Sequence, residues 1–233
     1  MKECILRTLG TETKPSSAAA CIAAVACIEL PENVSCFTCP SLTFQLTPST
    51  LQKWPELIDS LMSSVTSPPA SAPNADALRE ASLESLGYIC QDAPMWVLEP
   101  KSNSILNAIV TGMREEEQGQ TRVAAANALL NALEFSKRNF ENEAEKNVIM
   151  SVVCTATQAA DTQIRIVALQ CLVKIMSLYY SLITEEHIKA LFAITVHAMR
   201  AEDSDVALQG IEFWSNVCEE EMELQAEAEE VGF

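Results

Sequence analysis

The stretch that decides the fold is residues 101–140, KSNSILNAIVTGMREEEQGQTRVAAANALLNALEFSKRNF. Its apolar residues recur every three or four positions in two blocks, which is the period of an amphipathic helix. A polar turn separates the blocks. Ser104 or Ser102 is expected to cap the first helix, and Gly119 is expected to lie in the turn. The stretch therefore predicts a helical hairpin, which needs neighbours on both sides to cover its apolar faces.

The first predicted helix carries two adjacent apolar stripes. A helix turns only one face toward its own partner helix, so the second stripe either covers a neighbouring repeat or stays open as a groove. The two stripes are Ile105 with Ile109, and Leu106 with Val110 and Met113. The residues expected to face inward in the second helix are Val123, Ala126, Leu130 and Leu133.

The composition is that of a soluble globular protein. The chain has 233 residues, of which 48% are hydrophobic and 20% are charged, and it has only 6 glycines. Such a chain is too apolar to be disordered. It contains no uninterrupted apolar run of about 18 residues, so no membrane span is expected. The first residues carry a charge pair rather than the apolar block of a signal peptide.

The net charge of −17 favours basic partners. Phosphate binding requires Lys and Arg, so the charge argues against nucleic acid as a partner. Acidic residues gather near the end of the chain, at positions 219–221, 223, 227, 229 and 230. This segment is either a solvated helix end or frayed tail, or an acidic docking surface.

The sequence shows no pattern typical of an enzyme or a metal site. His187 and His197 are its only histidines and have no third ligand, and the CxxC of Cys36 and Cys39 has no second pair. We therefore expect no catalytic residue, no metal site and no cofactor. Four other cysteines fall near apolar helical positions and are interpreted as buried thiols in a reducing compartment: Cys90, Cys154, Cys171 and Cys218.

The second helices of successive hairpins repeat at a fixed interval. REASLESLGYIC, RVAAANALLNAL and RIVALQCLVKIM begin at Arg79, Arg122 and Arg165, each 43 residues after the one before. The Val-Ala-Leu-Gln of 167–170 returns at 206–209, a step of 39. Helix pairs at this period predict an all-α fold, an α-solenoid of HEAT repeats with about five hairpins in a right-handed superhelical stack.

The chain is expected to form a single solenoid, 1–233, interrupted once. Residues 34–52, VSCFTCPSLTFQLTPSTLQ, have no charge and no helical period, so they predict an insertion loop. We hypothesise that this loop is a translated intron, because pyrimidine-rich sequence encodes such residues. A spliced message that still encodes 37–51 would refute the hypothesis. The expected hairpins are 1–31, 53–92, 101–140, 143–181 and 185–224, followed by an acidic tail at 225–233.

Several segments resemble the importin-β family of nuclear transport receptors, the karyopherins. They include MKECILRTLGTET, ESLGYICQD, NALLNALEFSK, LVKIMSLYY and VALQGIEFWSNVCEEEM. The resemblance covers the chain except for 34–52 and the last few residues, and it corresponds to about a quarter of such a receptor, roughly its third to seventh repeats. It implies a fragment or an incomplete gene model of a protein that acts by binding, in the cytoplasm, the nucleus and the nuclear pore. Asp161, followed by Arg165, matches the HEAT pattern and is expected to cap a helix or to pair with an Arg of a neighbouring repeat.

The resemblance also implies a site for Phe-Gly nucleoporins on the outer surface, between the first helices of neighbouring repeats. The family has Thr, Ile and Phe at the positions of Asn107, Val110 and Val148, so this groove is expected to be wider and less aromatic. A Phe ring in it would bury apolar area worth roughly 2 kcal/mol, which suits weak multivalent contacts. Carried over by position, the site residues are Leu106, Asn107 and Val110 in one helix and Glu145, Val148 and Ile149 in the next.

Other partners follow from the same resemblance. The chain is expected to contribute part of a surface for the Ran GTPase, and importin-α or cargo would bind only a full-length protein. A second class of function remains open, in which a HEAT or armadillo scaffold holds basic peptides on an acidic concave face of second helices. A binding experiment with a Phe-Gly peptide would separate the two classes.

Overall fold

The computed structural model describes residues 56–68, 74–183 and 185–231, and every regular element within these ranges is a helix. The predicted all-α fold is therefore confirmed. The chain divides into two compact units, unit 1 (Met1–Phe135) and unit 2 (Ser136–Phe233). The predicted hairpin at 1–31, the predicted insertion at 34–52 and the first residues of the hairpin predicted at 53–92 lie outside the described residues.

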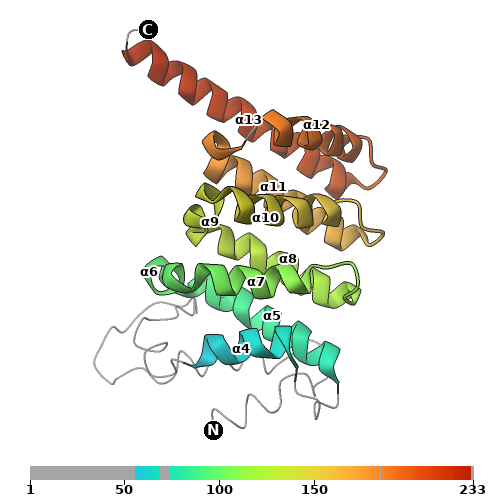
Figure 1. Cartoon of the computed structure of the whole chain (residues 1–233). Coiled ribbons are helices and arrows are strands. Elements are labelled where there is room, and N and C mark those ends of the chain that lie inside the picture. The colour runs from blue at the N-terminus through green and yellow to red at the C-terminus, as the bar shows by residue number, and fades with distance from the viewer. Residues whose placement is uncertain (1–55, 69–73, 184, 232–233) are drawn as a thin grey trace, which may run out of the picture. The chain divides into compact units, whose positions relative to one another are not determined.

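The described part of unit 1 stacks two helical hairpins. Its elements are α4 (Leu57–Thr66), α5 (Ala75–Asp92), α6 (Met95–Leu98), η1 (Glu99–Lys101), α7 (Ser102–Gly112), α8 (Gly119–Ala132) and η2 (Leu133–Phe135). α4 pairs with α5 and α7 with α8, while α4 also packs beside α7 and α5 beside α8 (Figure 1). The first helices thus form one layer and the second helices another. α6 and η1 connect the hairpin predicted at 53–92 to the one predicted at 101–140.

The core of unit 1 lies between these two layers. In α4, the buried residues are Leu57, Ile58, Leu61 and Val65. In α5, Ala81, Leu86 and Ile89 are buried and Leu78 is half-buried. Leu83 of α5 is also fully buried. It packs against α7, because a Cβ placed on Gly112 would lie 2.6 Å from its Cδ1.

The inward face of α8 differs from the predicted stripe. Ala126 and Leu133 are buried, but Val123 and Leu130 are only half-buried. The helix buries mainly small side chains instead, together with Leu129. These are Thr121, Ala124, Ala125, Ala128 and Ala132. Small residues let two helix backbones approach closely, so α8 lies tightly against α5, and a period taken from the larger residues points to the wrong face.

The start of each helix in the decisive hairpin was also mispredicted. α7 follows η1 directly and has Lys101 at its N-cap, with no side-chain hydrogen bond there. Ser102 and Ser104 therefore lie inside the helix and do not cap it. Gly119 is the first residue of α8 rather than part of the turn, which spans 113–118. The cause is η1, which supplies a preceding turn of helix in place of a side-chain cap.

Unit 2 contains two further hairpins. Its elements are α9 (Lys137–Glu141), α10 (Glu143–Ala156), α11 (Thr162–Tyr179), η3 (Tyr180–Leu182), α12 (Glu185–Met199) and α13 (Ser204–Val231). α10 packs against α11 and α12 against α13, and α11 lies against α13. Asp161 caps α11 by accepting a hydrogen bond from the Gln163 N–H at 2.8 Å, so the capping alternative for Asp161 is the one observed.

The last helix is longer than predicted and in a different register. α13 continues to Val231, so residues 225–231 of the predicted acidic tail are helical. Asp203 caps α13 through the N–H groups of Asp205 and Val206. The caps Asp161 and Asp203 are 42 positions apart in the sequence, not 39. The repeated Val-Ala-Leu-Gln misaligns the two helices by three residues, which is close to one helical turn and so preserves most of the apolar period.

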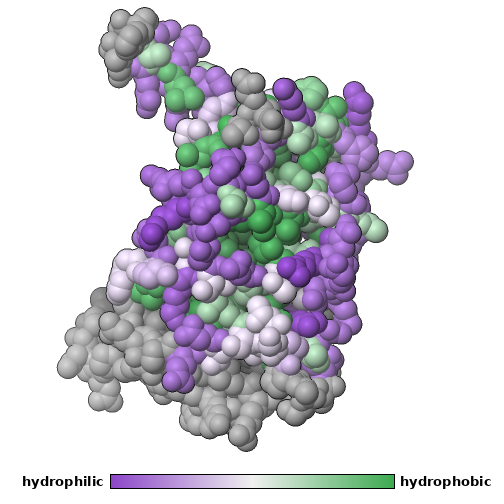
Figure 2. Space-filling model, in the orientation of Figure 1, coloured by the Kyte–Doolittle hydropathy of each residue, from purple (hydrophilic) through white to green (hydrophobic). Residues whose placement is uncertain are grey.

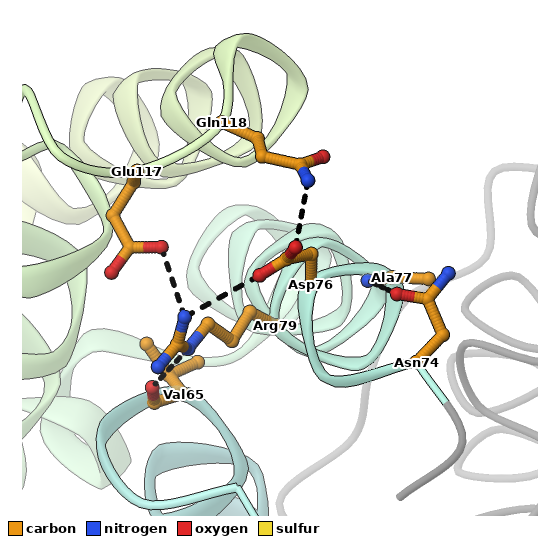
Figure 3. Close-up of polar contacts among 7 residues, drawn as sticks. All are labelled: Val65, Asn74, Asp76, Ala77, Arg79, Glu117 and Gln118. Atoms are coloured by element: carbon orange, nitrogen blue, oxygen red, sulfur yellow. Dashed lines mark hydrogen bonds and ion pairs between the residues drawn. The ribbon is translucent and has the colours of Figure 1, made fainter.

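Polar contacts fix the hairpins of unit 1 to each other. Arg79 of α5 donates to the Val65 carbonyl at 3.3 Å and to Glu117, in the turn of the next hairpin, at 3.2 Å. Gln118 donates to Asp76 at 2.7 Å (Figure 3). Arg165 of α11 instead donates to the carbonyls of Ala159 and Ala160, both at 2.9 Å.

Two asparagines join second helices of neighbouring hairpins. In unit 1, the Asn131 Nδ2 of α8 donates to the Gly87 carbonyl of α5 at 3.1 Å. In unit 2, the Asn216 Nδ2 of α13 donates to the Val173 carbonyl of α11 at 3.4 Å. The same kind of contact thus occurs in both units. In each, the asparagine lies about one repeat length after the residue whose carbonyl it contacts.

Candidate functional site

The half of the predicted site on α7 is mostly closed. Leu106 and Val110 are only 3% and 8% exposed, whereas Asn107 is exposed. The Asn107 carbonyl accepts a hydrogen bond from Thr111 Oγ1 at 2.8 Å. Of the two alternatives for this second stripe, its burial favours packing against protein over an open groove. A ligand can reach Leu106 and Val110 only if the side chains around them move.

The half of the predicted site on α10 is more open. Val148 is 52% exposed and Glu145 is half-buried, while Ile149 is 3% exposed. Apolar side chains reach the surface in the part of this face where α10 lies (Figure 2). α7 belongs to unit 1 and α10 belongs to unit 2. The two halves of the predicted site are therefore described separately.

A set of amide groups surrounds Glu145. Asn142, the N-cap of α10, accepts hydrogen bonds from the Ala144 and Glu145 N–H groups at 3.1 and 3.4 Å. Its Nδ2 donates to Glu145 Oε1 at 3.2 Å, and the Nδ2 of the buried Asn139 donates to Glu145 Oε2 at 2.7 Å. Asn142 is therefore the side-chain cap of α10, and its amide also contacts the carboxylate of Glu145 three positions later.

A buried cation lies next to this cap. The Lys146 side chain is 5% exposed, and its Nζ donates to Glu143 Oε2 at 2.8 Å and to the Leu182 carbonyl at 3.0 Å. The hydrogen bond from Lys146 holds the pKa of Glu143 below its ordinary value. Lys146 ties the first turn of α10 to the end of η3, a long-range contact that no local sequence signal indicates.

A second candidate site lies between α5 and α8. A pocket of about 320 Å³ opens there, lined by Glu80, Glu84 and Tyr88 of α5 and by Gln120, Asn127 and Asn131 of α8. Tyr88 is 46% exposed. Two carboxylates one turn apart, an aromatic ring and several amides can together bind a cationic side chain and the polar backbone beside it.

Groups associated with catalysis or redox chemistry are not gathered in the described part of the chain. Those residues contain no cluster of three or more possible metal ligands. Burial raises the pKa of Cys90 and of Cys171 to about 12, which keeps both thiols protonated. Cys154 is half-buried and Cys218 is exposed, so the prediction that all four are buried is wrong for these two.

One helical segment, Thr162–Leu182, is long and apolar enough to cross a membrane by length and composition. Half of its most apolar window is buried inside the structure. The segment includes α11, and a half-buried apolar helix is what the core of a helical hairpin stack requires.

Residues 55–229 match the family model "Stalled ribosome sensor GCN1-like, HEAT repeats". The chain belongs to the HEAT-repeat family. The match covers all the hairpins that the structure describes, and it agrees with the predicted repeat architecture.

This HEAT-repeat chain is similar to importin-β over nearly its whole length. It is 41% identical to importin subunit beta-1 of Schizosaccharomyces pombe, covering 99% of this chain and 24% of that protein. It matches the structure of yeast importin-β (Kap95p) with a TM-score of 0.77 and 38% identity, over 99% of this chain and 24% of that one. The predicted resemblance is therefore confirmed, and the chain spans about a quarter of the length of the curated relatives it matches.

Two complexes of Kap95 contain a similar chain. One is a Kap95:Nup1 complex, with a TM-score of 0.75 and 38% identity over 98% of this chain and 24% of the other. In the other, Kap95p binding induces the switch loops of RanGDP to adopt the GTP-bound conformation. Its TM-score is also 0.75, with 37% identity and the same coverage.

Proposed function

We propose that this chain forms part of a nuclear import receptor of the importin-β type and binds Phe-Gly segments of nucleoporins on its first helices. The similarity to Kap95, which has been solved with Nup1, supports this function. The observation that carries it is the surface of α10, where the 52% exposed Val148 lies three residues from the Glu145 carboxylate. Such a receptor acts in the cytoplasm, the nucleus and the nuclear pore.

The chemistry of this surface suits a Phe-Gly segment. Val148 offers apolar contact to a Phe ring, and Glu145 offers an acceptor to the N–H groups of the backbone next to it. Ile149 of the same helix is buried, so a ring gains its contact only when neighbouring side chains separate. That reorganisation lowers the affinity of each contact, and a receptor that moves through many such segments relies on weak, multivalent binding.

Substitution of Val148 tests the proposal. Val148→Asp should weaken binding of a Phe-Gly peptide by about tenfold or more, because it replaces apolar contact with a charge. Fluorescence anisotropy with a labelled peptide measures this. Leu224→Asp is the matched control, since Leu224 is 46% exposed on the far end of α13. Equal affinity of Val148→Asp and the parent would refute the site. Leu106 and Val110 make poorer probes, because a charge at either buried position would disrupt the fold.

We infer that the chain also contributes part of a surface for Ran. The structural similarity to Kap95p in its RanGDP structure supports this inference. Calorimetric titration with GTP-loaded Ran should give weaker binding than a full-length receptor shows, because the chain corresponds to about a quarter of such a receptor. The absence of any heat of binding at high micromolar Ran would refute the inference. Importin-α and cargo are proposed as partners of a full-length protein only.

The pocket between α5 and α8 favours a second candidate function, the binding of basic peptides. Glu80 and Glu84 line one wall of it and Tyr88 is exposed beside them. A double Glu80→Gln, Glu84→Gln variant should bind an Arg-rich peptide several-fold more weakly than the parent, and its affinity should depend less on salt. A Glu227→Gln, Glu229→Gln variant makes the same change in charge on the exposed end of α13. Equal losses in both variants would show nonspecific attraction to the acidic chain.

A further inference from the structure

We propose that the pocket between α5 and α8 selects arginine over lysine, because Asn127 and Asn131 present their amide oxygens to a ligand that stacks on the ring of Tyr88. This inference rests on the second function proposed above, the binding of basic peptides, and it names the side chain that the pocket takes. It assigns a binding role to two asparagines that the sequence did not single out.

The pocket is open because small residues lie where the two helices meet. Gly87 of α5 and Ala124 and Ala128 of α8 line it, and a Cβ on Gly87 would lie only 3.4 Å from the Ala128 Cα. Longer side chains of both helices surround these residues and leave a recess between them. Its volume of about 320 Å³ is at the small end of the range of roughly 300–1,000 Å³ for ligand pockets, which suits one long side chain.

Two internal hydrogen bonds fix which way the asparagine amides face. The Asn127 Nδ2 donates to the Val123 carbonyl at 3.0 Å, and the Asn131 Nδ2 donates to the Gly87 carbonyl at 3.1 Å. A backbone carbonyl can only accept, so each amide turns its nitrogen toward that carbonyl and its oxygen away from it. Within the described residues, no donor is hydrogen-bonded to either oxygen. Both residues line the pocket, which therefore offers two acceptors about one helical turn apart.

The aromatic wall of the pocket comes from α5. Tyr88 is 46% exposed and lines the pocket, so part of its ring is open to a ligand. A guanidinium is planar and can stack on this ring while the N–H groups at its edge donate to the asparagine oxygens. The ammonium of lysine is a compact, more strongly hydrated group that cannot stack as a plane. A ring combined with neutral acceptors therefore favours arginine.

This selection differs in origin from the attraction that an acidic chain exerts on any cation. Glu80 and Glu84 line the same pocket and attract lysine and arginine alike from a distance, an effect that salt screens. The selection does not require either carboxylate to bond the ligand. The neutral acceptors and the ring act only on contact, so the preference for arginine should persist when salt has weakened the overall binding.

Two peptides and three variants test the proposal in the full chain at high salt. One peptide is rich in arginine and the other has lysine at each of those positions. Asn127→Leu keeps the size of an exposed side chain but removes the acceptor, and Tyr88→Leu keeps an apolar side chain but removes the ring. Gln225→Leu is the matched control, since it removes an exposed amide of α13, outside the pocket. Circular dichroism shows whether each variant is folded.

Fluorescence anisotropy should show that the parent binds the arginine peptide about three- to tenfold more tightly than the lysine peptide, as a stacked and hydrogen-bonded guanidinium requires. Asn127→Leu and Tyr88→Leu should each lower this ratio, whereas Gln225→Leu should keep it. An unchanged ratio in a folded Asn127→Leu variant would overturn the proposal.

The parent protein alone separates this proposal from the function on which it rests. Equal binding of the two peptides by the parent would overturn the selection of arginine and leave the basic-peptide function standing. If the parent binds neither peptide at low or high salt, the basic-peptide function itself fails.

Discussion

Two glycines in unit 1 show how differently two close helix contacts respond to one added carbon. A Cβ on Gly112 of α7 would lie 2.6 Å from Leu83 Cδ1 and 3.1 Å from the Ala125 Cβ. A Cβ on Gly87 of α5 would meet nothing closer than the Ala128 Cα at 3.4 Å, an ordinary contact. Leu83 and Ala125 are fully buried and have no open space into which they can withdraw.

Gly112→Ala should therefore lower the free energy of unfolding by about 1–3 kcal/mol, because the extra methyl overpacks the contact of α7 with α5 and α8. Gly87→Ala, the matched control, should leave it unchanged or raise it by up to about 1 kcal/mol, because alanine is the better helix former. Urea denaturation followed by circular dichroism measures both. Equal destabilisation of the two variants would contradict the packing argument.

At the scale of the element, the sequence predicted the existence of the helices better than their faces. The apolar period located the hairpin of α4 and α5 and that of α10 and α11 to within a few residues, because large aliphatic side chains mark their buried stripes. It failed for α8, where the alanines face inward and the larger Val123 and Leu130 lie at the margin. Side-chain size is a guide to burial only where the neighbouring helix leaves room for a large residue.

The candidate site was less predictable than the fold. Periodicity placed Leu106 and Val110 on a stripe apart from Ile105 and Ile109, but whether that stripe meets protein or solvent depends on elements distant in sequence. The cap of α10 by Asn142 was not predicted, although a local signal existed for it, a cap residue followed three positions later by Glu. The contacts of Asn139 with Glu145 and of Lys146 with Leu182 had no such signal, because they depend on where α9 and η3 lie.

A hydrogen bond between the long last helix and the end of the preceding hairpin can be observed by titration. The Tyr180 hydroxyl of η3 donates to Glu221 of α13. This bond, then partial burial, then the charges of Glu221 and Glu220, raise the pKa of Tyr180 from 10.0 to about 12. The folded state therefore keeps the phenol proton at pH values where the unfolded chain has lost it.

The stability contributed by this bond should be fully present below about pH 10 and should be lost as the pH rises through about 12. Glu221→Gln should lower the pKa of Tyr180 toward its ordinary value, which ultraviolet absorbance of tyrosinate measures. Tyr180→Phe should remove the corresponding fall in unfolding free energy over this pH range. A titration curve unaffected by Glu221→Gln would contradict the assignment.

At the scale of the molecule, equivalent positions in successive repeats need not have equal burial. Ile149 of α10 and Leu169 of α11 are only 3% and 2% exposed. Their counterparts one hairpin later are Phe192 of α12 and, by the register of the helix caps, Ile211 of α13. These are 55% and 56% exposed. The repeat pattern supplies an apolar residue at each position, whereas burial requires another hairpin beyond it.

Truncation of the two counterparts should therefore have unequal effects. Leu169→Ala should lower the free energy of unfolding by about 2–5 kcal/mol, as expected for a buried leucine. Ile211→Ala should change it by less than about 1 kcal/mol, because most of the side chain is already in water. Guanidinium denaturation of the two variants in parallel provides the comparison. A similar loss in both would mean that Ile211 is covered in solution.

The asparagine contacts between second helices have a mechanical consequence. The Asn131 amide on the Gly87 carbonyl and the Asn216 amide on the Val173 carbonyl each join two packed helices through one polar point. Sliding one helix along the other would break that hydrogen bond, whereas a small rotation about it changes the bond length little. Each asparagine therefore acts as a pivot that resists shear and permits twist, so a unit under load should flex by turning its hairpins and keep their registers.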